Sequence, residues 1–321
     1  MVDKTHHPNF FLIGTVKGGT TSLHRYLDQH PDIYLSPIKE VNYFSKDDID
    51  PNHFAKDYRH DIAIDLPKYL KEGMPYPVHI AHVIDKKDYL KLFSKAGNAS
   101  AIGEMSLSYM LYENTPKKIF EIYPKAKIIA MLRNPADRAF SQYIMNLKQG
   151  KILENDFIKE IVQDDEQKIK GWGANHQYLM IGKYYEQLKR YYSLFPKEQI
   201  KIFLFDDYLK NPESIVKEMF EFLGVGSQIN INTSEKANEG GVPKLKKINY
   251  FLNQSGIISW AKNNLPRSWR ATFKNLMYKT DKSSIPKMTT EQRQFLINYY
   301  ESDILQLEKL IGRDLKSWRT I

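Results

Sequence analysis

Residues 17–22, with the sequence KGGTTS, have the chemistry and the spacing of an anion-binding turn. The turn combines one cation, two glycines and three hydroxyls, namely Lys17, Gly18, Gly19, Thr20, Thr21 and Ser22. Glycine lets the backbone adopt positive φ and approach a ligand closely, and the hydroxyls lie beside the free N–H groups expected at a helix start. The helix N-terminus adds about half a positive charge to that of the lysine, so phosphate is the expected ligand.

A glycine-rich turn between a strand and a helix can also be purely structural, and the motif alone leaves that alternative open. In the G-x-x-x-x-G-K-[ST] loop of nucleoside triphosphatases, the lysine follows the glycines and the next hydroxyl holds magnesium. Here Lys17 precedes Gly18 and Gly19. The turn is therefore not a Walker A sequence.

A second candidate phosphate site lies at Arg133 and Ser141, in the stretch RNPADRAFS. Arg133 ends an apolar run, and Ser141 lies two turns into the helix that we expect after it. An arginine fork and a hydroxyl could hold one phosphate between them, a geometry for which arginine is better suited than lysine. The alternative is that Arg133 pairs with a surface carboxylate.

Each of the two candidate phosphate motifs follows a short apolar run, and the two runs are expected to be strands that end at one edge of a sheet. Residues 10–13 and 128–132 are wholly apolar, which is typical of strands buried on both faces of a parallel sheet. Asn134 and Pro135 then have the residue types of a helix cap and a first helical residue. Residues 200–212 predict another apolar strand, which ends in an acidic turn. The pattern indicates an α/β protein.

Further polar candidates follow two other predicted strands. Residues 33–44 predict a short strand followed by a turn at Pro37, and residues 101–109 predict a strand and a turn. The candidates are Lys39, Glu40, Glu104, Ser106 and Ser108. We expect them at the sheet edge where open α/β proteins build their sites.

The rest of the chain is expected to support this edge. Residues 45–100 lack a clean period and predict a loop-rich insertion that could form one wall of a substrate cleft. Residues 236–247 predict a loop containing Gly240 and Gly241, which is either a flap over a nucleotide or a solvated linker. Residues 242–321 predict a mostly helical C-terminal part. The default is one domain over residues 1–321, because the length barely exceeds that of a single large core.

Composition excludes several classes of function. The chain has no cysteine, so disulfides, thiolate zinc sites and cysteine nucleophiles are absent, and its histidines show no convincing ligand spacing for a metal. The net charge of +9 favours anionic ligands, but the lysines are dispersed and match no nucleic-acid motif. No apolar run approaches the roughly 18 residues of a membrane span, and no signal peptide precedes the first strand. We therefore expect a cytoplasmic protein without nucleic-acid or membrane partners.

Taken together, these motifs resemble those of the sulfotransferases that use 3′-phosphoadenosine 5′-phosphosulfate (PAPS). TVKGGTTS at residues 15–22 resembles the family's 5′-phosphosulfate loop, and residues 133–141 resemble its 3′-phosphate motif. Three weaker similarities, KEVNYF, GEMSLSY and the closing helical pattern, extend the resemblance over nearly the whole chain, and KEVNYF is closer to the heparan-sulfate-type and bacterial branches. The resemblance implies a three-layer α/β fold with a central, mostly parallel sheet, a P-loop-like phosphosulfate-binding turn, helices on both faces and a helical C-terminal part.

The resemblance also implies roles for individual residues. Lys17 would contact the bridging oxygen and the transferring sulfuryl group, and Glu40 would be the general base. The remaining PAPS contacts would be Gly18, Gly19, Thr20, Thr21, Ser22, Arg133, Ser141, Gly240 and Gly241. Lys39, Glu104 and Ser106 are candidates for acceptor binding, and Glu104 is the reserve base. In the late loop a glutamate stands where the family often has a basic residue, so the lysine that reaches the nucleotide is undetermined.

We therefore expect a metal-independent transfer of the sulfuryl group from PAPS to a hydroxyl or amine of a glycan or small-molecule acceptor. Two alternatives stay open from the sequence. One is a P-loop kinase or nucleotide hydrolase, although the G-K-[ST] element is missing. The other is a non-catalytic polyanion-binding protein, which the charge would suit. The sequence leaves the acceptor and the oligomeric state open.

Overall fold

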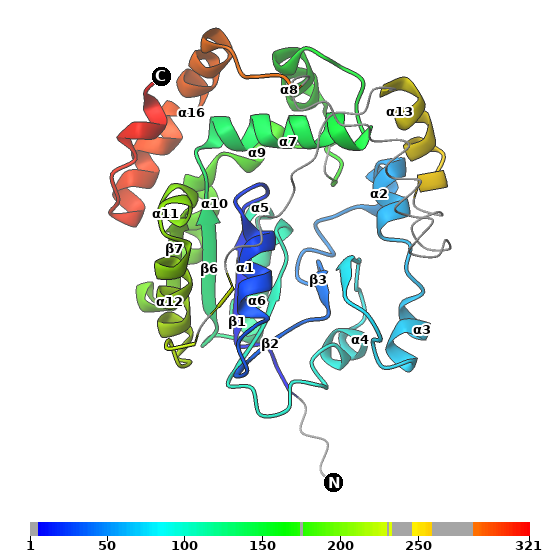
Figure 1. The fold of residues 1–321 in the computed structure, drawn as a ribbon, viewed down its shortest axis with the longest axis vertical. Coiled ribbons are helices and arrows are strands. Elements are labelled where there is room, and N and C mark those ends of the chain that lie inside the picture. The colour runs from blue at the N-terminus through cyan, green and yellow to red at the C-terminus, as the bar shows by residue number, and fades with distance from the viewer. Residues whose placement is uncertain (1–5, 174–175, 230, 233–245, 259–284) are drawn as a thin grey trace.

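The fold is centred on a five-stranded parallel sheet with the strand order β2-β5-β1-β6-β7 (Figure 1). The computed structural model describes residues 6–173, 176–229, 231–232, 246–258 and 285–321. The strands are β1 (Phe10–Gly14), β2 (Ile33–Leu35), β5 (Ala101–Met105), β6 (Lys127–Leu132) and β7 (Ile200–Leu204). All four pairings are parallel, so the carboxyl ends of the strands meet at one edge. The predicted α/β class is confirmed.

Helices cover both faces of this sheet. On one face, Phe10 and Leu12 of β1 pack with α1 (Thr20–Leu27) and α12 (Pro212–Leu223). On the other, Phe11 and Ile13 share a core with helices of the opposite layer. These include α5 (Ser108–Leu111), α6 (Thr115–Ile122) and α10 (Tyr184–Tyr192). The alternation along β1 thus produces the expected three layers.

Helix α7 (Pro135–Gln149) crosses the carboxyl edge of the sheet (Figure 1). Its cap agrees with the sequence prediction: the Asn134 side chain accepts from the backbone N–H groups of Ala136 and Asp137, and Pro135 is the first helical residue. Gly150 ends the helix in the left-handed region, with φ 67°. The helix therefore begins directly after β6 and lies over the turn that follows β1.

A second sheet, separate from the first, contains only β3 (Ile38–Glu40) and β4 (Val78–Ile80) in parallel. We predicted a turn at Pro37 but no strand after it, so β3 corrects that interpretation. The insertion between β3 and β5 is largely irregular, as expected, with short elements inside it. These are η1 (Pro51–His53), α2 (Lys56–Asp61), α3 (Leu66–Lys71), β4 and α4 (Lys86–Lys91).

The remaining described elements are mostly helical. They are α8 (Phe157–Glu166), α9 (Tyr178–Ile181), η2 (Lys197–Gln199), α11 (Phe205–Lys210), α13 (Lys246–Gln254), α16 (Thr290–Ile311) and η4 (Lys316–Arg319). Helix α11 occupies the segment for which we predicted an acidic turn, so that prediction was wrong. Helix α16 begins with a capping box between Thr289 and Gln292. No helix in the described part of the chain combines the length and the apolar character needed to cross a membrane.

Candidate functional site

The turn after β1 has the backbone of an anion-binding site. Gly19 is the N-cap of α1 at φ 88°, and because glycine has no side chain it cannot occupy the free N–H groups of the first helical turn. Gly18 passes so close to β6 that an added Cβ would lie 2.6 Å from the carbonyl oxygen of Met131. Lys17 itself adopts φ 65°. Both glycines are thus required by geometry, and the helix N-terminus stays open to a ligand.

The Lys17 ammonium points from this turn toward α7. Its Nζ lies 3.6 Å from the sulfur of Met145, in the C-terminal half of that helix. Burial first, and then the neighbouring cations Arg133, Lys148, Lys39 and Arg138, together lower the pKa of Lys17 to about 8. A partly buried cation surrounded mainly by cations is an arrangement that an anionic ligand would stabilise.

Arg133 joins the two predicted phosphate motifs. Its Nη1 donates to the backbone carbonyl of Lys17 at 3.3 Å, and its guanidinium lies 4.8 Å from the ring centroid of Phe205. Burial lowers the pKa of this guanidinium. Among the described residues its close contacts are this carbonyl and this ring, not a carboxylate partner. The geometry therefore favours an anion site over the surface ion pair that the sequence left open.

Ser141 lies on the face of α7 that is directed toward the Lys17 turn. Residues 141, 145 and 148 follow one another at helical spacing, and each is half-buried. Met145 contacts Lys17, and the charge of Lys148 contributes to the lowered pKa of Lys17. The structure thus brings Ser141 to the same side of the molecule as Arg133 and Lys17.

Glu40 and Lys39 reach the site from β3. Both are 8% exposed, and Lys39 Nζ lies 3.9 Å from the Glu40 carboxylate. The same ammonium donates to Thr21 Oγ1 at 3.1 Å, so Lys39 connects β3 to the start of α1. Burial lowers the pKa of Lys39, and the charge of Glu40 opposes that shift. A carboxylate therefore lies one side chain away from the anion-binding turn.

Glu104 and Ser106 are enclosed by protein instead of lying at the open edge. The Glu104 carboxylate, 1% exposed, accepts from the phenols of Tyr89 at 3.0 Å and Tyr109 at 2.8 Å. Burial raises the pKa of Glu104 to about 8. Ser106 is fully buried, and its Oγ accepts from two backbone N–H groups. Ser108 is fully buried as well. The expectation that these side chains project from the sheet edge was therefore wrong, because β5 and α5 turn them into the core.

His24 is a residue that the sequence analysis missed. It lies three residues after Thr21 and therefore on the same face of α1. Burial, together with Lys39 and His79, lowers the pKa of its imidazole to about 4. The ring is thus neutral near pH 7 and lies close to the Lys39 ammonium. Helical spacing from Thr21 was the signal that could have identified it.

A cavity of about 280 Å³ lies between the insertion, the end of α5 and the segment that contains Trp172. Trp172 and Tyr112 form part of its wall, with their ring centroids 5.6 Å apart. The carboxylates in its lining belong to Asp48, Asp50 and Glu113. Aromatic rings and carboxylates together are groups that can hold a hydroxyl-rich ring by stacking and hydrogen bonding.

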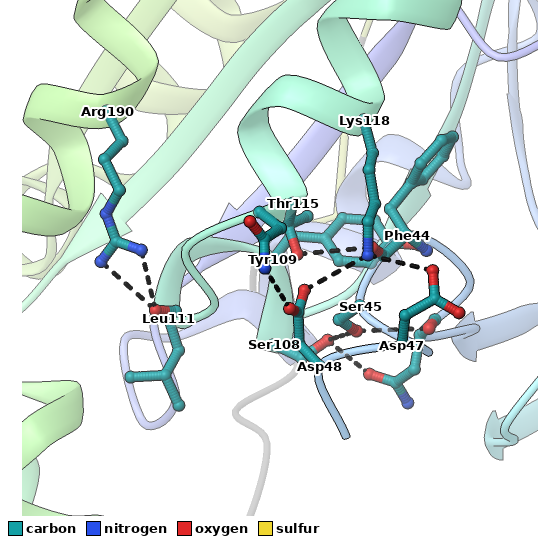
Figure 2. Close-up of polar contacts among 12 residues, drawn as sticks. Phe44, Ser45, Asp47, Asp48, Ser108, Tyr109, Leu111, Thr115, Lys118 and Arg190 are labelled. Carbon is teal, nitrogen blue, oxygen red and sulfur yellow. Dashed lines mark hydrogen bonds and ion pairs between the residues drawn. The ribbon is translucent and has the colours of Figure 1, made fainter. Parts of the chain in front are cut away.

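Polar contacts at the rim and behind the wall connect the segments that line this cavity. Figure 2 shows the Arg190 guanidinium donating to the carbonyl of Leu111, at 3.3 Å from both terminal nitrogens. It also shows the Lys118 ammonium between Asp47 and Asp48, at 3.1 Å and 3.5 Å. These contacts link Asp48 and Leu111, two residues of the cavity lining, to α6 and α10.

The cavity and the anion site share a hydrophobic wall. Trp172 belongs to a buried cluster that Val16 and Ile80 pack against. Val16 directly precedes Lys17, and Ile80 is the register partner of Glu40. Burial and then the charge of Glu40 raise the pKa of Tyr58, a further member of this cluster. The hydrophobic cluster behind Trp172 thus extends to residues that adjoin Lys17 and Glu40.

Two of the predicted nucleotide contacts, Gly240 and Gly241, lie outside the described residues. In the described ranges, no group of three or more histidine, aspartate or glutamate side chains is arranged to hold a metal ion.

Comparison with known proteins shows where this architecture occurs. The model of the sulfotransferase domain matches residues 7–310. Human bifunctional heparan sulfate N-deacetylase/N-sulfotransferase 2 is 26% identical over 97% of this chain, which spans 30% of that protein. Mouse carbohydrate sulfotransferase 15 is 24% identical over 68% of this chain, which spans 44% of it. The crystal structure of a sulfotransferase from Alicyclobacillus acidocaldarius is 29% identical with a TM-score of 0.70, covering 98% of this chain and 100% of that one.

Proposed function

Because the chain belongs to the sulfotransferase family, we propose that the Lys17 turn and Arg133 hold the two phosphate groups of PAPS for sulfuryl transfer. The 5′-phosphosulfate would lie on the open N-terminus of α1, where Thr20, Thr21 and Ser22 follow Gly19. The 3′-phosphate would lie between Arg133 and Ser141. Backbone N–H groups, a lysine and an arginine fork are suited to these anions.

In the proposed reaction the acceptor oxygen or nitrogen attacks sulfur in line with the departing phosphate. A bond forms between acceptor and sulfur, the bond from sulfur to the 5′-phosphate oxygen breaks, and its electron pair stays on that oxygen. Lys17 and the helix N-terminus stabilise the charge that grows there. The acceptor proton passes to the Glu40 carboxylate, which acts as general base.

One contact carries this proposal: Lys39 Nζ donates to Thr21 Oγ1 while it lies 3.9 Å from Glu40. It links the anion-binding turn with a carboxylate from a different sheet. A purely structural turn would not need such a neighbour, and a nucleotide hydrolase would need the missing G-K-[ST] element. A non-catalytic polyanion binder would need exposed cations, whereas Lys17 and Lys39 are largely buried.

Calorimetry with 3′-phosphoadenosine 5′-phosphate (PAP), compared with ATP and magnesium, tests the nucleotide assignment. We expect tight binding of PAP that EDTA does not change. Preference for ATP with magnesium would overturn the assignment. Transfer from sulfur-labelled PAPS to an acceptor then tests catalysis directly.

For the acceptor we propose a hydroxyl or amine of a glycan or small molecule, with the Trp172 cavity as the place of an adjoining sugar ring. The names of the curated relatives mention heparan sulfate and carbohydrate, which supports a glycan. A panel of neutral oligosaccharides, uronate-containing glycans, phenols and simple amines, each incubated with labelled PAPS and read by mass spectrometry, tests this choice. Exclusive transfer to phenols would contradict it.

A further inference from the structure

We propose that Asn42 is a positioning residue that sets the place of the Glu40 carboxylate. This inference rests on the proposed role of Glu40 as general base. Asn42 follows Glu40 by two residues and has no exposed surface. It therefore acts through the backbone of β3 and not by touching either substrate.

The Asn42 amide ties the end of β3 to its neighbour. Its Nδ2 donates to the carbonyl of Glu40 at 3.3 Å and to the carbonyl of Ala81, just after β4, at 3.1 Å. Its Oδ1 accepts from the Ser108 hydroxyl at 2.6 Å. Both donors and the acceptor of this amide are therefore used in a buried place, where satisfied polar groups specify one arrangement.

The same residue is anchored to the main sheet. The Ser106 Oγ, directly after β5, accepts from the backbone N–H groups of Val41 and Asn42, each at 3.1 Å. The Ser45 Oγ lies 2.8 Å from the Ser108 Oγ (Figure 2) and 3.2 Å from the carbonyl oxygen of Asn42, so its single proton can be donated to either. The turn after Glu40 is thus fastened to the β5–α5 junction from several directions.

Glu40 and the strand that precedes Lys17 belong to different sheets, so contacts outside the strands must set the relative position of Glu40 and Lys17. Lys17 follows β1 of the five-stranded sheet, whereas Glu40 ends a three-residue strand of a separate two-stranded sheet. A sheet of that size is marginally stable by itself, so its position relative to Lys17 must come from other contacts. A general base is effective only when held within about 0.5 Å of its productive position. The Asn42 contacts supply that constraint.

The residue type is also specific. Asn42 adopts φ 56°, a left-handed conformation that asparagine tolerates better than most residues. An aspartate would keep the shape but would turn both amide donors into acceptors facing two carbonyl oxygens. An alanine would leave the Ser108 hydroxyl and those two carbonyls without their partner. Asn42→Asp is therefore the matched substitution, and Ser108→Ala is a milder one that removes a single contact.

A double-mutant cycle tests the proposal. The four proteins are the wild type, Asn42→Asp, Glu40→Gln and the double variant, each assayed for turnover of labelled PAPS and for PAP affinity. We expect Asn42→Asp to lower kcat by about 10- to 100-fold, as small displacements of catalytic groups do, without changing PAP affinity. In the Glu40→Gln background the same substitution should cost nothing further, because there is no base left to misplace.

Controls keep the outcomes distinct. Asn249→Asp alters another fully buried asparagine, on α13, and should lower the melting temperature without the kcat loss. Equal losses from Asn42→Asp in both backgrounds would mean a general structural effect and would overturn the positioning role. If Asn42→Asp does not fold, Ser108→Ala enters the same cycle with the same expectation. Unchanged turnover in Glu40→Gln alone would instead refute the proposed base.

Discussion

Arg133 Nη1 donates to the backbone carbonyl of Lys17 across 3.3 Å, so the residue that directly follows β6 holds the turn that follows β1. These strands are neighbours in the sheet, and their carboxyl ends meet there. One guanidinium can therefore support the 5′ turn with one nitrogen and face a 3′-phosphate with others. The two proposed phosphate sites therefore adjoin each other.

Arg133→Lys should weaken the binding of PAP by at least about tenfold, because lysine lacks the fork that binds phosphate and supports the turn. The affinity for adenosine 5′-phosphate, which has no 3′-phosphate, should fall much less. Calorimetry with both nucleotides measures the difference. Equal losses for the two ligands would place the 3′-phosphate elsewhere.

Lys17→Met should abolish measurable sulfuryl transfer, since it removes the cation that stabilises the departing phosphate oxygen. The same substitution should raise the melting temperature of the ligand-free protein near pH 7. It removes a buried charge whose neighbours are mostly cations, so the folded state loses a repulsion. Turnover near the wild-type rate would refute the assignment of the turn.

PAP affinity should depend on pH through Lys17. The free protein carries a lysine pKa lowered to about 8, and a bound anion favours the charged form and so raises that pKa. Below pH 8 the ammonium is protonated and binding is strong. As the pH rises above 8, the dissociation constant should increase by up to about tenfold per pH unit. Calorimetry from pH 7 to 9.5 should show this slope in the wild type and its loss in Lys17→Met.

Glu40→Gln should lower kcat by about 10²–10⁴-fold, the usual contribution of a general base, and should leave PAP affinity unchanged. Glutamine keeps the shape and a carbonyl oxygen near Lys39, so the turn is not disturbed. Stopped assays with labelled PAPS measure the rate. If the rate is unaltered, the neutral imidazole of His24 becomes the next group to substitute.

Trp172→Ala should raise KM for a glycan acceptor by about tenfold, because stacking on a sugar ring is lost while the reacting groups stay in place. The KM for PAPS should not change. Tyr76→Ala is a control that removes an exposed aromatic ring outside the lining of this cavity. A parallel rise in both KM values would indicate a general effect on the fold.

Local sequence was sufficient for the elements that carry the phosphate contacts. Glycine conformations, helix caps and short apolar runs depend on residues within a few positions, so β1, α1, β6 and α7 follow from the stretches that contain Lys17 and Arg133. The same reasoning failed at residues 205–210, where we predicted an acidic turn. There the acidic residues instead occupy the first turn of α11, which their charge stabilises.

The tertiary structure decided which polar residues meet. Glu104 looked equivalent to Glu40 in sequence, since each follows or ends a short apolar strand. Packing of β5 between β2 and β1 directs Glu104 toward two tyrosines in the core, whereas β3 lies in a separate sheet and presents Glu40 beside Lys39 and Thr21.

The sequence by itself therefore determined a phosphate-binding strand, turn and helix, because their signals are local. Only the tertiary structure decided that Lys39 spans from Thr21 to Glu40 and that Asn42 ties β3 to the main sheet. Those contacts join segments up to 66 residues apart, as between Asn42 and Ser108. No local pattern encodes them, because they depend on how the two sheets pack.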